Sequence, residues 1–138
     1  MAPLSIGLAK CEQGDEYASY ELGKMYEHGN GVSINLGKAI RWYTQAAEKG
    51  IGLAQHNLGA CYSNSDPPNR DMEKAAFWFH KAAEHGLKLS MLSLSRIYEL
   101  GEGVERDFDK ARYWKEKAEK AMDSIAAEVW SSEPIRQH

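Results

Sequence analysis

The side chains that could carry catalysis or hold a metal are few in this chain of 138 residues, and their spacing favours neither role. His80 and His85 are five residues apart, so on one helix they would point to different faces. The chain also lacks the HExxH pattern of a zinc site. Cys61 lies 36 residues after Met25 and 36 before Ile97, which predicts a buried thiol and not a nucleophile. We therefore expect no catalytic residue, no metal ligand and no cofactor.

Charge and apolar content limit the partners and the compartment. Lys and Arg total 17 and Asp and Glu total 20, a net charge of −3, which argues against a protein that binds nucleic acid through phosphate contacts. No apolar run approaches the ~20 residues of a membrane span, and the start MAPLSIGLAK lacks the pattern of a signal peptide. We expect a cytoplasmic protein; a periplasmic or secreted one is the alternative if a signal peptide was removed ahead of Met1.

An internal repeat of 36 residues is the strongest pattern, and it indicates the elements that position all other side chains. The segment LGKMYEHGNGV begins at Leu22 and returns as LSRIYELGEGV from Leu94, with LGACYSNSDPP from Leu58 between them. A second segment recurs as KAIRWYTQAAEKG, KAAFWFHKAAEHG and KARYWKEKAEKAM. The residues expected in the core of the repeats are Leu22, Tyr26, Trp42, Leu58, Tyr62, Trp78, Leu94, Tyr98 and Trp114.

Each repeat is predicted to contain two helices. In the first repeat an apolar face at helical spacing runs over about residues 15–28 and ends at glycines. The second helix begins at Asn35, whose side chain can cap free amides, and stops before Gly50. Equivalent caps are expected at Asp71 and Asp107. Close approach of the paired helices is expected at the small residues Gly23, Gly59 and Ser95.

The combined pattern resembles a known family. Leucine-glycine, tyrosine, a glycine-glycine-valine loop, lysine-alanine, tryptophan and alanine-alanine-glutamate-x-glycine are similar to the Sel1-like repeat, a relative of the tetratricopeptide repeat. The resemblance covers about residues 9–119. It implies an all-α fold, a short right-handed α/α solenoid of three helix-pair repeats, and a scaffold or adaptor role. We expect a single domain with repeats at about 15–50, 51–86 and 87–121.

The chain departs from the repeat in two places. The second repeat has residues 65–68, Ser-Asp-Pro-Pro, in place of the glycine loop, which predicts a stiffer loop with a distinct surface. The third has Met122 where a glycine stops the earlier repeats, so its second helix is expected to continue to about Trp130. The expected ends are an N-terminal cap at about 3–13, a C-terminal cap at about 122–130 and a loose tail at 131–138.

The candidate binding surface is the face of each first helix that packing does not require. In tetratricopeptide-like solenoids these helices line the concave face. The surface residues differ between repeats while the inward ones are alike, and Lys24 and Arg96 could hold carboxylates. The alternative is ordinary solvated helix surface. The predicted partner-binding residues are Tyr17, Tyr20, Lys24, Glu27, Leu53, His56, Ala60, Ser63, Leu89, Leu92, Arg96 and Glu99.

Three functional hypotheses follow from this pattern. We expect a protein–protein interaction module, a bacterial adaptor or scaffold that is a monomer and binds a protein or peptide on the concave face. The family resemblance also admits an immunity-type protein that neutralises a toxic bacterial effector by one-to-one binding. A third hypothesis, a small-molecule hydrolase, is permitted by resemblance to some family members. It would need perturbed carboxylates or a nucleophile–base pair, and the sequence has neither pattern.

Overall fold

The protein is all-α, and its helices follow one another in pairs. The computed structural model describes residues 7–8 and 15–121. Over residues 15–121 it has six helices and no strand. The predicted N-terminal cap, apart from residues 7–8, and the predicted C-terminal cap and tail lie outside this part. The helices are α2 (Glu16–His28), α3 (Leu36–Glu48), α4 (Gly52–Asn64), α5 (Met72–Glu84), α6 (Lys88–Leu100) and α7 (Phe108–Lys120).

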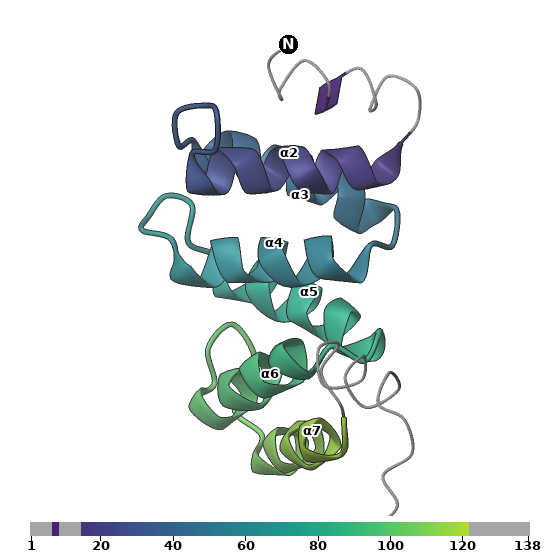
Figure 1. The fold of residues 1–138 in the computed structure, drawn as a ribbon. Coiled ribbons are helices and arrows are strands. Elements are labelled where there is room, and N and C mark those ends of the chain that lie inside the picture. Colours follow the sequence, from purple (N-terminus) through teal and green to yellow (C-terminus); the bar gives the residue numbers. More distant parts are fainter. Residues whose placement is uncertain (1–6, 9–14, 122–138) are drawn as a thin grey trace, which may run out of the picture.

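The pairs stack into an elongated solenoid (Figure 1). We call α2, α4 and α6 the A helices, and α3, α5 and α7 the B helices. Each A helix packs on the B helix of its own pair. Neighbouring pairs are joined by the contacts of α3 with α4 and of α5 with α6. In Figure 1, α2 and α4 are seen from the side and α7 almost end-on, so the pairs turn along the stack. The predicted α/α solenoid of three helix pairs is confirmed.

The predicted caps position the B helices. The side chain of Asn35 accepts a hydrogen bond from the backbone N–H of Lys38 over 3.0 Å, and Asp71 accepts one from Lys74 over 3.1 Å. Asp107 caps α7 in the same way. Such a cap contributes about 1 kcal/mol to stability. The caps therefore fix where each B helix begins.

One pair of contacts closes the loop between the A and B helices in every repeat. The backbone N–H of Asn35 donates to the carbonyl of Tyr26 over 2.9 Å, and the ammonium of Lys38 lies 5.3 Å from the Tyr26 ring centroid. The same two contacts form at Tyr62 and Tyr98. A cation over an aromatic face is attracted by the ring quadrupole. The proline loop of the second repeat and the glycine loops of the others are therefore closed by the same contacts.

The structure corrects the prediction of which aromatic side chains are buried. Trp42 and Trp78 are only half-buried, whereas the next residues, Tyr43 and Phe79, are 0% and 3% exposed. Trp114 is buried, as predicted. The predicted tyrosines are partly buried against the core, and the predicted leucines are completely buried. These leucines are Leu22, Leu58 and Leu94.

Glycines on the A helices make room for the two buried rings. A Cβ atom added at Gly23 would lie 2.5 Å from the Tyr43 ring, and one at Gly59 would lie 2.9 Å from the Phe79 ring. Both distances are too short for any side chain, so the ring takes the space that a Cβ would need. The predicted close approach at Gly23 and Gly59 is therefore confirmed. In each pair the glycine faces the aromatic residue that follows the tryptophan of the B helix.

The third repeat replaces this glycine and ring by two polar residues. Ser95 stands at the glycine position, and its hydroxyl donates to the carbonyl of Ala111 over 2.6 Å. Lys115 stands at the ring position and is exposed. The third repeat therefore has a cation where the first two repeats have a buried aromatic side chain.

The end of α7 also differs from the prediction. Gly50 and Gly86 follow α3 and α5 with φ of 91° and 88°, and this left-handed residue turns the chain into the next A helix. We expected α7, which lacks such a glycine, to continue to Trp130. It ends instead at Lys120, and Ala121 leaves the helix in an extended conformation (φ −82°, ψ 143°).

Candidate partner-binding surface

The predicted surface runs along the A helices, and one end of it is apolar. Tyr17, Leu53 and Leu89 occupy the same position in α2, α4 and α6, and they are 50%, 44% and 66% exposed. Leu92, about one turn further along α6, is 40% exposed. We call these four side chains the apolar ridge. Single exposed apolar residues are ordinary, but aligned ones on adjacent elements are typical of an interaction site.

Tyr20 does not belong to this surface, and its prediction as an exposed anchor is wrong. Its side chain is 7% exposed, and its ring centroid lies 6.1 Å from that of Tyr43. Both residues belong to the core cluster that includes Leu58 of the next pair. Burial raises the pKa of the Tyr20 hydroxyl. Because the core of one pair continues into the next, this position of α2 is enclosed between α3 and α4.

The other end of the surface is polar and contains a cleft of about 410 Å³ between α4 and α6. Four predicted residues line it: His56, Ala60, Ser63 and Arg96. The structure therefore brings a third of the predicted residues to one concave site. The remaining lining includes side chains from the two loops that follow α4 and α6.

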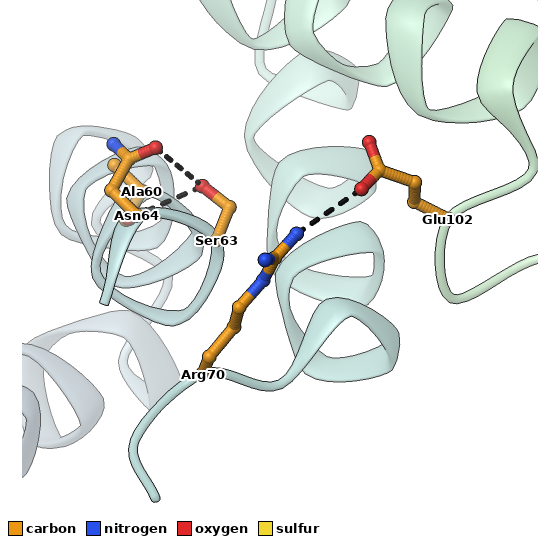
Figure 2. Close-up of polar contacts among 5 residues, drawn as sticks. All are labelled: Ala60, Ser63, Asn64, Arg70 and Glu102. Carbon is orange, nitrogen blue, oxygen red and sulfur yellow. Dashed lines mark hydrogen bonds and ion pairs between the residues drawn. The ribbon is translucent and has the colours of Figure 1, made fainter. Parts of the chain in front are cut away.

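An ion pair borders the cleft at these loops. Arg70 Nη2 lies 3.1 Å from Glu102 Oε2 and joins the loop of the second repeat to that of the third (Figure 2). Beside it, the hydroxyl of Ser63 lies 3.2 Å from the carbonyl oxygen of Ala60 and 3.3 Å from Asn64 Oδ1. The paired side chains are 46% and 37% exposed, so the ion pair contributes at most about 1 kcal/mol to stability. Its main effect is to hold the Arg70 guanidinium at the cleft.

His56 connects the two helices that form the cleft. Its Nδ1 lies 2.7 Å from the hydroxyl oxygen of Ser90, and its ring centroid lies 5.4 Å from that of Phe79. Burial lowers the pKa of His56 below its usual 6.5, and the charge of Glu27 opposes this shift. Ser90 is completely buried. A substrate could not reach its hydroxyl, so the contact is structural and does not form a nucleophile–base pair.

Two other predicted residues are held by contacts within the protein. The ammonium of Lys24 lies 5.2 Å from the ring centroid of Tyr20. Oε1 of Glu27 accepts a hydrogen bond from the hydroxyl of Tyr43 over 2.5 Å. Burial raises the pKa of Tyr43, and this hydrogen bond raises it further. Both predicted residues are half-buried, so they are less available to a partner than the exposed Arg96.

Arg96 and Glu99 are exposed on α6. Neither side chain forms a hydrogen bond or ion pair with another residue of the described part. Two further cations near them, Arg70 and Lys115, were not predicted as site residues. Lys115 had a signal in the sequence, because it breaks the series of aromatic residues at its position. For Arg70 the signal was weaker: it lies two residues after Pro68 of the proline loop.

The buried thiol confirms the prediction for Cys61. The residue is 3% exposed, and burial raises the pKa of its thiol to about 12, so the thiol stays protonated and unreactive. Cys11 lies outside the described residues. Among those that are described, no group of three His, Cys, Asp or Glu side chains could hold a metal. In the same part of the chain, no helix has both the length and the apolar character needed to cross a bilayer.

The fold and the surface define a helical repeat protein of the α/α solenoid class. The Sel1 repeat family matches the chain three times, at residues 16–51, 52–87 and 88–121. These matches cover most of the chain, which therefore belongs to the Sel1 repeat family. Proteins built from Sel1 repeats generally serve as scaffolds for protein–protein interaction.

Three solved bacterial structures are similar to the chain. A protective antigen of uropathogenic Escherichia coli with an SLR fold is 37% identical, with a TM-score of 0.80 over 85% of this chain and 25% of that one. A Sel1 repeat protein from Oxalobacter formigenes is 31% identical, with a TM-score of 0.75 over 83% of this chain and 47% of that one. Helicobacter pylori cysteine rich protein B is 23% identical and shares the fold, with a TM-score of 0.64 over 91% and 90%.

The chain is much shorter than the first two of these relatives. The chain spans a quarter of the Escherichia coli antigen and about half of the Oxalobacter protein. No curated protein matches it in sequence. The activity of a whole relative therefore does not transfer to this chain, and its partner has to be inferred from its own surface.

Proposed function

We propose that this protein is a non-enzymatic adaptor that binds a segment of a partner protein along its A helices. The general role of Sel1 repeats as interaction scaffolds supports a protein partner. A solenoid presents the same face of successive repeats side by side, which produces an extended binding surface. The apolar ridge lies on that face and carries the proposal.

A comparison with the B helices supports the choice of face. Phe77 on α5 and Tyr113 on α7 are also about half exposed. The ammonium of Lys81 lies 5.3 Å from the Phe77 ring centroid, and that of Lys117 lies 5.6 Å from the Tyr113 ring centroid. No described cation lies over the ring of Tyr17, the aromatic residue of the apolar ridge. A partner can therefore cover this ring without first displacing a lysine.

Site-directed photocrosslinking in the native host tests this proposal. A photoreactive phenylalanine analogue replaces Leu53 or Leu89 on the ridge, and Phe77 serves as the matched control position. We expect one defined protein to be crosslinked from both ridge positions and not from position 77. The same adduct from position 77 alone would place the binding surface on the B helices and contradict the proposal.

Charge substitutions on the apolar ridge measure how much the ridge contributes to the affinity for the partner. Leu53→Asp and Leu89→Asp should each weaken binding of the crosslinked partner at least tenfold, because a carboxylate would have to be buried against apolar groups. Both positions are exposed, so the unfolding free energy should change by no more than about 0.5 kcal/mol. Phe77→Asp, with the same change in charge, should leave the affinity unaltered.

A further inference from the structure

Two hollows meet at Arg96. The first is the cleft between α4 and α6, where Arg70 and Arg96 both line the wall. The second, of about 380 Å³, lies between α6 and α7, and its lining includes Leu92, Arg96 and Lys115. Arg96 thus stands between a cation on each side, and Leu92 of the apolar ridge adjoins it. The three cations come from different elements: a loop, α6 and α7.

The charges of the two hollows are positive on balance, although the chain as a whole carries −3. Their charged residues are three cations and two carboxylates, Glu99 and Glu102. Glu102 is already paired with Arg70. Arg96 and Lys115 form no ion pair with any described residue. Arg96 and Lys115 therefore face one unpaired carboxylate, Glu99, and the two hollows keep one positive charge in excess.

We propose that the partner segment is acidic, and that an Asp or Glu side chain of it binds Arg96 while neighbouring apolar residues lie on the apolar ridge. This inference rests on the proposed function. A guanidinium presents its donors in a planar fork that matches both oxygens of a carboxylate. Arg70 and Lys115 add attraction from the two sides.

A carboxylate suits the site better than a phosphate group. Glu99 and Glu102 line the same two hollows as Arg96. Together with the three cations they leave one positive charge in excess, whereas a phosphoryl group carries nearly two negative charges at neutral pH. A singly charged carboxylate matches this excess.

Peptide selection against the full-length protein tests the inference. The probe is a phage library of random dodecapeptides, panned in about 0.1 M salt, where charged groups still attract over roughly 10 Å. We expect the selected peptides to be enriched in Asp and Glu next to large apolar residues. Replacing those acids by Asn and Gln should weaken binding at least tenfold.

Two variants of equal charge locate the site. Arg96→Gln removes the guanidinium between the hollows, and Arg41→Gln removes an exposed guanidinium of α3 that likewise has no ion pair in the described part. Neither substitution removes a side-chain hydrogen bond or ion pair of the described part, so both should fold, as far-ultraviolet circular dichroism can verify. We expect selected peptides to lose at least tenfold in affinity with Arg96→Gln and less than twofold with Arg41→Gln.

Four results would overturn the inference: no selected peptides, peptides without acidic enrichment, equal effects of the two variants, or a phosphoserine peptide that binds more than tenfold tighter than its Asp counterpart. Peptides without acids that still depend on Leu53 and Leu89 would leave the proposed function intact while this inference fails. Acidic peptides that bind Arg96 but are insensitive to Leu89→Asp would contradict the role of the apolar ridge, on which the proposed function rests, while the acidic contact with Arg96 would stand.

Discussion

At the scale of single residues, His56 shows how a surface residue of one repeat becomes a link to the next. The in-phase residues are Tyr20, which is buried, and Leu92, which is exposed. His56 lies between these extremes, with Ser90 and Phe79 as its neighbours. The same sequence position is thus enclosed early in the described solenoid and open at its third repeat, because a following helix pair covers it only in the earlier repeats.

The lowered pKa of His56 makes stability depend on pH. The unfolded chain takes up a proton at this residue near pH 6.5, whereas the folded chain does so only at lower pH. Folding stability should therefore fall as the pH drops below about 6.5, until the folded pKa is reached. His56→Gln keeps a group that can bond to Ser90 but does not titrate.

Urea unfolding at pH 7.5 and pH 5.0 measures this contribution. We expect the wild type to lose more unfolding free energy between the two values than His56→Gln does. The other histidines are common to both proteins, so they cancel in the comparison. Equal losses in the two proteins would mean that burial does not shift the titration of His56.

At the scale of elements, the distance between paired helices depends on a glycine and a ring. Gly23→Ala would place a Cβ atom 2.5 Å from the Tyr43 ring, which is itself completely buried and cannot move aside. We expect a loss of about 1–3 kcal/mol in unfolding free energy. Gly37 is the matched control, because its new Cβ would meet only the side chain of Asn35 at 3.5 Å.

Chemical denaturation of the two alanine variants separates packing from helix propensity. Gly37→Ala should be neutral or stabilising by about 0.5 kcal/mol, since alanine favours a helix more than glycine does. Gly23→Ala gains the same propensity but loses the close contact. If both variants were stabilised, α2 and α3 would have to separate easily, and the glycine would not set their distance.

At the scale of the whole molecule, stability is shared between neighbouring pairs. The middle pair, α4 and α5, packs on α3 at one side and on α6 at the other. In repeat proteins the interfaces between neighbours supply much of the stability of each unit. We therefore expect the amide hydrogens of α4 and α5 to exchange more slowly than those of α2 and α7.

Hydrogen–deuterium exchange tests this order, and a pair of variants tests its cause. Phe79→Ala removes a ring buried between the A helices of two repeats and should cost about 3–5 kcal/mol, with faster exchange in both α4 and α6. Phe77→Ala removes a half-exposed ring from the same helix and should leave the exchange of α4 and α6 nearly unchanged. Slowest exchange in α2 would contradict a cooperative middle pair.

The sequence by itself determined the features that depend on neighbouring residues along the chain. The 36-residue period, the caps at Asn35, Asp71 and Asp107, and the buried leucines were all predicted and are present. Caps and helix faces depend on residues at most a few positions apart. Their geometry is therefore contained in short stretches of sequence.

Only the tertiary structure decided how these helices face one another. A helix face is several residues wide, and a small rotation exchanges the inner residue for its neighbour, so Tyr43 and Phe79 are buried more deeply than the tryptophans before them. Tyr20 is buried because the next helix pair covers it. The cleft forms where Arg70 meets Glu102, which is 32 residues further along the chain. The superhelical turn of the pairs brings these side chains together, and the repeat pattern alone does not specify that turn.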